Sequence, residues 1–232
     1  MNDDNLNEIF SPQPVDPELL GRIEKSIASS IKPVRPMMPE WMLVSGLMLA
    51  CVAIGVTFAA LSGFMGIERL SVVQIVSIFG ALAVLIFLAA TISARAMVPG
   101  SRRIASSPAL ALVGCVALTS IFTLLFPDHT ITNFVPRGLN CLRAGLLTAI
   151  PTAAAAWLIL RRGFAVNKLD AALASGLVAG LSGLLMLELH CPNFQVMHVM
   201  IWHTAVFPLS GFAVVILVQL FGKKRKAAEF MQ

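Results

Sequence analysis

The residues between Leu187 and His203 hold most of the groups in this chain that could do chemistry. The stretch reads LELHCPNFQVMHVMIWH and contains a glutamate, three of the four histidines and one of the four cysteines. It lies between two long apolar runs, where an ionisable group is costly unless it is paired or meets water. We interpret it as the outer hairpin of two membrane helices and as the sensing end of the protein.

The composition indicates a protein that spans a membrane. Apolar residues make up 57% of the chain and charged residues 12%, whereas soluble domains carry about 25% charged residues. Six apolar runs each have about the 20 residues that a helix needs to cross a bilayer. They cover residues 41–61, 71–92, 108–126, 139–160, 171–190 and 198–221. The predicted fold is all-α: a polytopic bundle of six transmembrane helices with a short cytoplasmic N-terminal helical tail.

The basic residues set the expected orientation. Lys and Arg gather before the first span, in the second and fourth connectors and after the last span, whereas the odd connectors hold only Arg69 and Arg137. Because Lys and Arg are enriched in cytoplasmic loops, we expect both termini in the cytoplasm and the protein in a bacterial inner membrane. The formal charge of +5 therefore reflects topology, and no direct contact with nucleic acid is expected.

Three regions follow: a cytoplasmic tail at 1–40, a six-helix bundle at 41–221 and a basic cytoplasmic C-terminus at 222–232. In the tail, Asp16-Pro17-Glu18 is typical of a helix start. Such a short helix is marginal alone, and its modest basic content argues against a membrane-surface helix. We therefore predict that one apolar face binds a groove of a soluble partner. That face consists of Leu19, Leu20, Ile23, Ile27 and Ile31.

Cys141 and Cys191 are expected at the outer ends of the fourth and fifth spans. In an oxidising periplasm two such thiols can form a disulfide or a redox-reactive pair. A metal site with the nearby histidines is a second interpretation, and two unrelated small membrane residues are a third. The interpretations differ in geometry, because a disulfide needs Cα atoms within about 7 Å.

The histidines of the stretch offer metal or proton sensing and structural anchoring as alternatives. His190 and His198 are the candidate metal ligands. His198 and His203 are five residues apart, about 140° around an α-helix, so we expect that they do not bind one ion together. Arg143 and Glu188 fall in the outer turns of spans four and five, where pairing is the usual way to hold charges. We predict a structural ion pair between them, and we expect no catalytic residue and no cofactor.

Several short motifs in fixed order resemble the NrsF family, bacterial six-span negative regulators of extracytoplasmic-function sigma factors. They are SIKPVRPMMP before the first span, GLNCLRAGLLTAIP followed by LRRG, a glycine-rich fifth span and LHCPN…HVMIWH. The resemblance implies a non-enzymatic anti-sigma factor whose tail keeps the sigma factor from RNA polymerase and DNA. It also implies that Cys141 and Cys191 sense oxidative or metal stress. Trp202-His203 departs from the aromatic pair common in the family.

Two other functional classes remain open. A membrane thiol oxidoreductase would use Cys141 and Cys191, although the chain has no CxxC motif. A small transporter would use the outer Cys/His cluster, with Arg143 and Glu188 in a pore. Neither the particular sigma factor, the signal nor the oligomeric state follows from the sequence.

Overall fold

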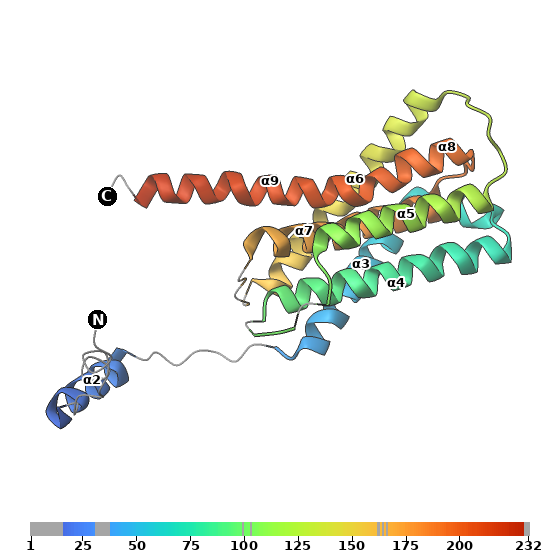
Figure 1. Cartoon of the computed structure of the whole chain (residues 1–232). Helices are drawn as coiled ribbons and strands as arrows, with labels where there is room; N and C mark the ends of the chain where they lie inside the picture. Colours follow the sequence, from blue (N-terminus) through green and yellow to red (C-terminus); the bar gives the residue numbers. More distant parts are fainter. Residues whose placement is uncertain are drawn as a thin grey trace, which may run out of the picture. The chain divides into compact units, whose positions relative to one another are not determined.

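The computed structural model is described in two compact units, Met1–Pro36 and Met37–Gln232. Every regular element in the described residues is helical (Figure 1), which confirms the predicted all-α fold. The first unit contains α2 (Pro17–Ser30), and the second contains the bundle. The described residues are 16–30, 38–98, 100–102, 104–161, 163, 165 and 167–229, without the side chains of 29–30 and 222–229.

Helix α2 begins where the sequence predicts. The Asp16 carboxylate accepts a hydrogen bond from the backbone N–H of Glu18 at 2.9 Å, which satisfies one of the free N–H groups of the first turn. The predicted apolar face lies on this helix, and its side chains are between 44% and 53% exposed: Leu19, Leu20, Ile23 and Ile27. Ile31, the fifth predicted member, lies outside the described residues.

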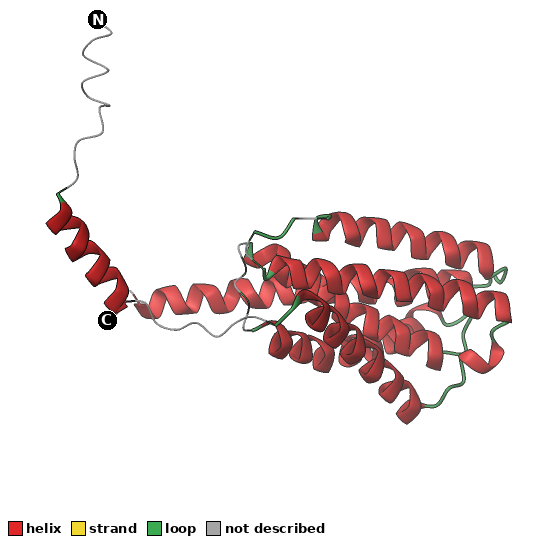
Figure 2. Cartoon of the chain, turned by 90° about the horizontal axis from the view of Figure 1, so that it is seen from below, coloured by secondary structure: helices red, strands yellow, loops and turns green. Residues whose placement is uncertain are grey.

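The second unit contains six helical segments long and apolar enough to cross a membrane (Figure 2), as predicted. The first five are α3 (Glu40–Ser62), α4 (Val72–Ala96), α5 (Ser107–Leu125), α6 (Phe134–Leu160) and α7 (Lys168–His190). The sixth, Val196–Phe221, comprises α8 (Val196–His198), the π-helical turn η2 (Val199–His203) and most of α9 (Thr204–Glu229). A 3-10 helix, η1 (Ile67–Arg69), lies between α3 and α4.

Helix α6 begins five residues before its predicted start. Pro136 falls in its first turn, where backbone N–H groups have no partner within the helix, so proline is tolerated there. The polar residues around Arg137 therefore belong to the helix rather than to the connector. This early start places Cys141 two turns inside α6 instead of at its tip.

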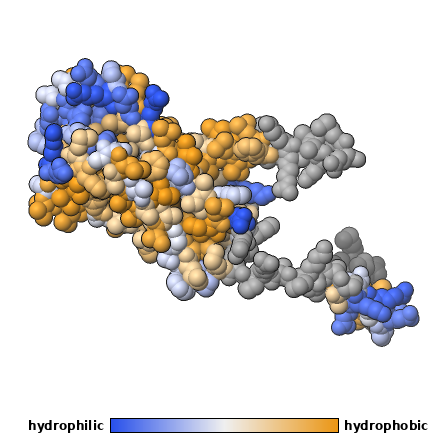
Figure 3. All heavy atoms as spheres, turned by 180° about the vertical axis from the view of Figure 1, so that it is seen from behind, coloured by the Kyte–Doolittle hydropathy of each residue, from blue (hydrophilic) through white to orange (hydrophobic). Residues whose placement is uncertain are grey.

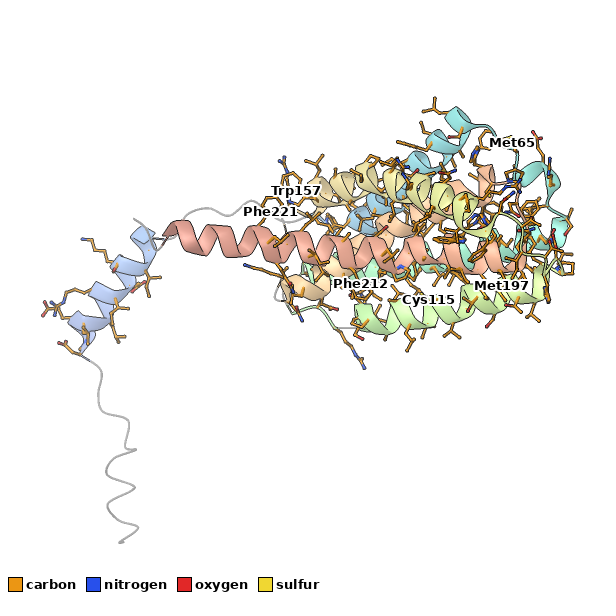
Figure 4. All side chains as sticks on the ribbon, turned by 90° about the horizontal axis from the view of Figure 1, so that it is seen from above. Met65, Cys115, Trp157, Met197, Phe212 and Phe221 are labelled. Carbon is orange, nitrogen blue, oxygen red and sulfur yellow. The ribbon has the colours of Figure 1, made fainter. Side chains whose placement is uncertain are left out.

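The flank of the bundle is largely apolar, whereas one end is hydrophilic (Figure 3). Large side chains on the flank, including Trp157, Phe212 and Phe221 labelled in Figure 4, are exposed. An apolar patch of this extent is not left in water by soluble proteins. The surface is thus the one that a hydrocarbon environment requires of a helical bundle.

Helix α7 is the centre of the bundle and contacts α3, α4, α5, α6 and α9. Of the 18-residue apolar segment of α7, 94% is buried inside the protein, whereas the corresponding share is at most 44% for any other span. Small residues make this possible, because they let helix backbones approach closely in a membrane. A Cβ atom added at Gly180 would lie 2.7 Å from the carbonyl oxygen of Phe207, and one at Gly183 would overlap the carbonyl oxygen of Gly145. These glycines therefore form a small-residue face on α7, against which the backbones of α9 and α6 pack directly.

Replacing Gly183 by Ala is expected to destabilise the bundle by about 1–3 kcal/mol, because the added methyl group meets backbone that cannot rotate away. Gly80→Ala is the matched control, since nothing lies within 4 Å of its added Cβ. Thermal unfolding of the detergent-solubilised protein measures both variants. Equal melting temperatures for the two variants would contradict the close packing of α6 against α7.

Candidate functional site

Three connectors meet at one end of the bundle and enclose the predicted sensing stretch. The N–H of Gly66, between α3 and α4, donates to the carbonyl of Leu189 at 3.1 Å. The N–H of Val196 donates to the carbonyl of Asp128, between α5 and α6, at 2.9 Å. The hairpin between α7 and α8 is therefore fixed from both sides by backbone hydrogen bonds.

Cys191 stands at the point where α7 ends. Its backbone is extended, and its N–H donates to the carbonyl of Leu187 at 2.8 Å. Pro192 follows, and proline cannot continue the hydrogen bonding of the helix. The Cys191 side chain is only 4% exposed, so this helix end points its thiol into the bundle.

The π-helical turn Val199–His203 brings His198 and His203 together. In a π-helix the hydrogen bonds join residues five apart, so residues at that spacing lie one above the other. The two imidazole centroids are 5.2 Å apart in an edge-on arrangement. The sequence-based expectation that these residues diverge by about 140° was wrong, because it assumed an α-helix.

Four side chains from α6, the end of α7, α8 and η2 converge, and we call them the Cys/His cluster: Cys141, Cys191, His198 and His203. The two sulfur atoms are 3.5 Å apart, and the Cys191 sulfur is 3.6 Å from Nε2 of His198. One potential ligand atom from each residue lies within 4.8 Å of all the others. All members are buried except Cys141, which is partly exposed.

Glu188 is paired with His203 rather than with Arg143, which corrects the predicted ion pair. Its Oε1 lies 2.8 Å from Nδ1 of His203, and both side chains are about 1% exposed. Arg143 is exposed. It follows Cys141 by two residues, about 200° around an α-helix, so it faces away when Cys141 faces α7.

His190 is not a member of the cluster, which corrects its prediction as a metal ligand alongside His198. Its Nδ1 lies 2.9 Å from the carbonyl oxygen of Gly63. His190 lies two positions after Glu188, so the two side chains point to opposite sides of α7. His190 therefore attaches the connector between α3 and α4, which is the anchoring role that the sequence left open.

A cap of aromatic and polar contacts joins the hairpin between α7 and α8 to the connector between α5 and α6. The rings of Phe126 and Phe194 stack with centroids 5.3 Å apart. Nε2 of Gln195 donates to the hydroxyls of Thr130 and Thr132 at 2.9 and 2.7 Å. Hydrogen bonds from Thr130 lower the pKa of the exposed Asp128 carboxyl. These contacts join the hairpin to the connector between α5 and α6, although Oε1 of Gln195 is buried without a hydrogen-bond partner among the described residues.

Several polar atoms around the cluster have unused bonding capacity. Nε2 of His203, Nδ1 of His198 and Oε2 of Glu188 are buried and have no hydrogen-bond partner among the described residues. The pKa of the Cys191 thiol is raised, first by its hydrogen bond with Cys141 and then by burial. Thiols and imidazoles at these distances can bind a metal ion, and the thiols can be oxidised to a disulfide.

The other two cysteines lie outside the cluster. Cys51 is buried in α3, and its thiol donates to the carbonyl of Val178 at 3.5 Å. Cys115 is half-buried on α5 (Figure 4). Both fit the expectation that cysteine in a span behaves as a small apolar residue.

Replacing His203 by Ala is expected to destabilise the protein by about 3–5 kcal/mol, because Glu188 would remain buried without its partner. The double variant Glu188→Leu/His203→Leu is expected to lose less stability than the sum of the losses of the single variants Glu188→Leu and His203→Leu, because it removes both polar groups together. His129→Ala, on the exposed connector, is the control. The free energies of unfolding of the detergent-solubilised variants give the interaction energy between Glu188 and His203. If the stability losses of the single variants simply added up in the double variant, the pair would contribute nothing beyond its separate side chains.

Comparison with known proteins gives one family. Searches of curated proteins and of solved structures found no significant match. The family model NrsF, described as negative regulator of sigma F, matches residues 27–221. This range includes the whole bundle, the Cys/His cluster and the last turn of α2. The chain therefore belongs to the NrsF family, the negative regulators of sigma F.

Proposed function

We propose that this protein is a membrane-bound anti-sigma factor. Its cytoplasmic tail, residues 1–40, holds an extracytoplasmic-function sigma factor at the inner membrane of a bacterium and releases it when an envelope signal reaches the other end of the bundle. Family membership supports regulation of a sigma factor. The distribution of Lys and Arg supports a cytoplasmic tail and C-terminus.

The observation that carries this proposal is the apolar face of α2. Four large apolar side chains lie within nine residues of one short helix, and each is about half exposed: Leu19, Leu20, Ile23 and Ile27. Basic and acidic residues occupy other positions of the same helix, including Arg22, Glu24 and Lys25. An amphipathic helix of this kind fits a hydrophobic groove, where residues at spacings of three and four act as anchors.

The signal is proposed to act on Cys141 and Cys191. Their sulfur atoms are within 3.5 Å of each other, and the residues come from different spans. A redox or metal event at this pair would change how α6 and α7 are held together at one end. Coupling to the tail requires that the bundle has two states with different affinity for the sigma factor.

Replacing Leu20, Ile23 and Ile27 by Ser is expected to weaken sigma-factor binding by at least about tenfold, because each buried aliphatic side chain contributes about 1.5–3 kcal/mol. Co-purification of the sigma factor with the solubilised full-length protein measures this loss. Arg22→Ser/Lys25→Ser, two exposed residues away from the apolar face, is the matched control. Equal capture by the triple variant and wild type would reject the tail as the binding segment.

Cys141→Ser and Cys191→Ser are each expected to leave the sigma factor repressed after exposure to an oxidant or a metal salt, because one remaining thiol cannot form the pair. A sigma-dependent reporter in cells measures the response, and Cys115→Ser is the control for loss of a thiol elsewhere. A normal induced response in both variants would remove the cysteine pair from the signalling step.

A further inference from the structure

We propose that Cys141, Cys191, His198 and His203 form a closed four-ligand site for one divalent ion of the zinc class, such as Zn²⁺, with Co²⁺ or Cd²⁺ as substitutes. The inference names the ligand of the proposed sensor and rests on the proposed function for its role in regulation.

Two separations within the cluster match those of a tetrahedral site. Zinc–sulfur bonds of about 2.3 Å and zinc–nitrogen bonds of about 2.0 Å give ligand–ligand separations of roughly 3.8 Å for two sulfurs and 3.6 Å for sulfur and nitrogen. The structure has 3.5 Å between the Cys141 and Cys191 sulfurs and 3.6 Å between the Cys191 sulfur and Nε2 of His198. The fourth ligand atom, from His203, lies within 4.8 Å of the other three.

His203 is held in the orientation that a metal ligand needs. Its Nδ1 is bonded to the Glu188 carboxylate, which leaves Nε2 buried without a partner among the described residues. Histidine ligands of zinc commonly have a carboxylate on the opposite ring nitrogen, which fixes the tautomer and raises the basicity of the ligating nitrogen. This arrangement explains why a glutamate is buried at the end of a membrane helix.

The charges also favour an ion over a disulfide. Two thiolates and two neutral imidazoles around a divalent cation form a neutral set, and the one remaining negative charge, on Glu188, accepts a hydrogen bond from Nδ1 of His203. A disulfide would bring the sulfurs to about 2.05 Å and would leave Nε2 of His203 without a partner. Only an ion engages all four convergent side chains at once.

The site would connect parts of the chain that are far apart in sequence. Cys141 belongs to α6, Cys191 follows α7, and His198 and His203 begin the last span. Four protein ligands leave no open position for a substrate, as in structural zinc sites. Bound metal would therefore clamp three spans at one end of the bundle, and its loss would release them.

Cobalt binding to the reduced, detergent-solubilised full chain tests the proposal. We expect one Co²⁺ per chain, with the visible absorption of a tetrahedral site and a thiolate-to-cobalt charge-transfer band, both lost on addition of Zn²⁺. Cys141→Ser and His203→Ala are expected to abolish these bands. Glu188→Gln is expected to weaken affinity by about 10- to 100-fold. His190→Ala and Cys115→Ser are the matched controls and should bind like wild type.

A second measurement covers variants that fail to fold. In the wild-type protein, Zn²⁺ should protect Cys141 and Cys191 from alkylation, as read by mass spectrometry, while Cys115 serves as the unprotected internal reference. Absence of cobalt binding and of protection in the reduced protein would overturn the proposal, as would an unchanged cobalt spectrum in the cluster variants.

Sigma-factor capture by the same preparation is scored separately. A protein that captures the sigma factor but binds no cobalt rejects the metal site alone. A protein that binds cobalt through the four ligands but captures no sigma factor supports the site and rejects the tail hypothesis.

Discussion

The close backbone packing of α7 is the constraint on which the rest of the structure depends. No water solvates a polar side chain in hydrocarbon, so buried polar groups must find partners within the protein. Gly180 and Gly183 bring the backbones of α9 and α6 against α7. The same approach places His203 beside Glu188 and Cys141 beside Cys191. The polar site is thus a consequence of a small-residue face a few positions earlier in the same helix.

The elements were predictable from the sequence because each depends on local properties. Six apolar runs of sufficient length predicted six spans, and Asp16-Pro17 predicted the start of α2. The contact partners of the polar side chains were harder to predict, because they depend on the direction in which each side chain leaves its helix. Arg143 and Glu188 are both charged and at similar depth, yet a shift of two residues relative to Cys141 turns Arg143 away.

His203 was missed for a different reason. A spacing of five residues places His203 about 140° around an α-helix from His198. The π-helical turn between them reduces that angle, so that the two imidazoles meet. One signal was available in the sequence. Pro208 lies within α9 and cannot donate a hydrogen bond to the preceding turn, which favours irregular bonding just before it. Irregular turns of this kind are frequent at functional sites.

In the proposed sensor, the partial exposure of Cys141 would decide how a chemical signal reaches the cluster. The other three members are buried, and the stacked rings of Phe126 and Phe194 join two of the connectors at that end. A chemical agent would therefore meet Cys141 first, and its effect on Cys191 and the histidines would follow through that sulfur.

The π-helical turn also sets the rotational phase of the last span. It holds one residue more than an α-helical turn would, and each residue corresponds to about 100° of rotation. The buried positions of α9, including Val206, Phe207 and Gly211, face inward only with that extra residue counted. If the same residues formed an unbroken α-helix instead, α9 would be rotated by about 100° and its buried positions would turn away from α7. Length changes in the exposed connector at 127–133 involve no such reorientation of a span.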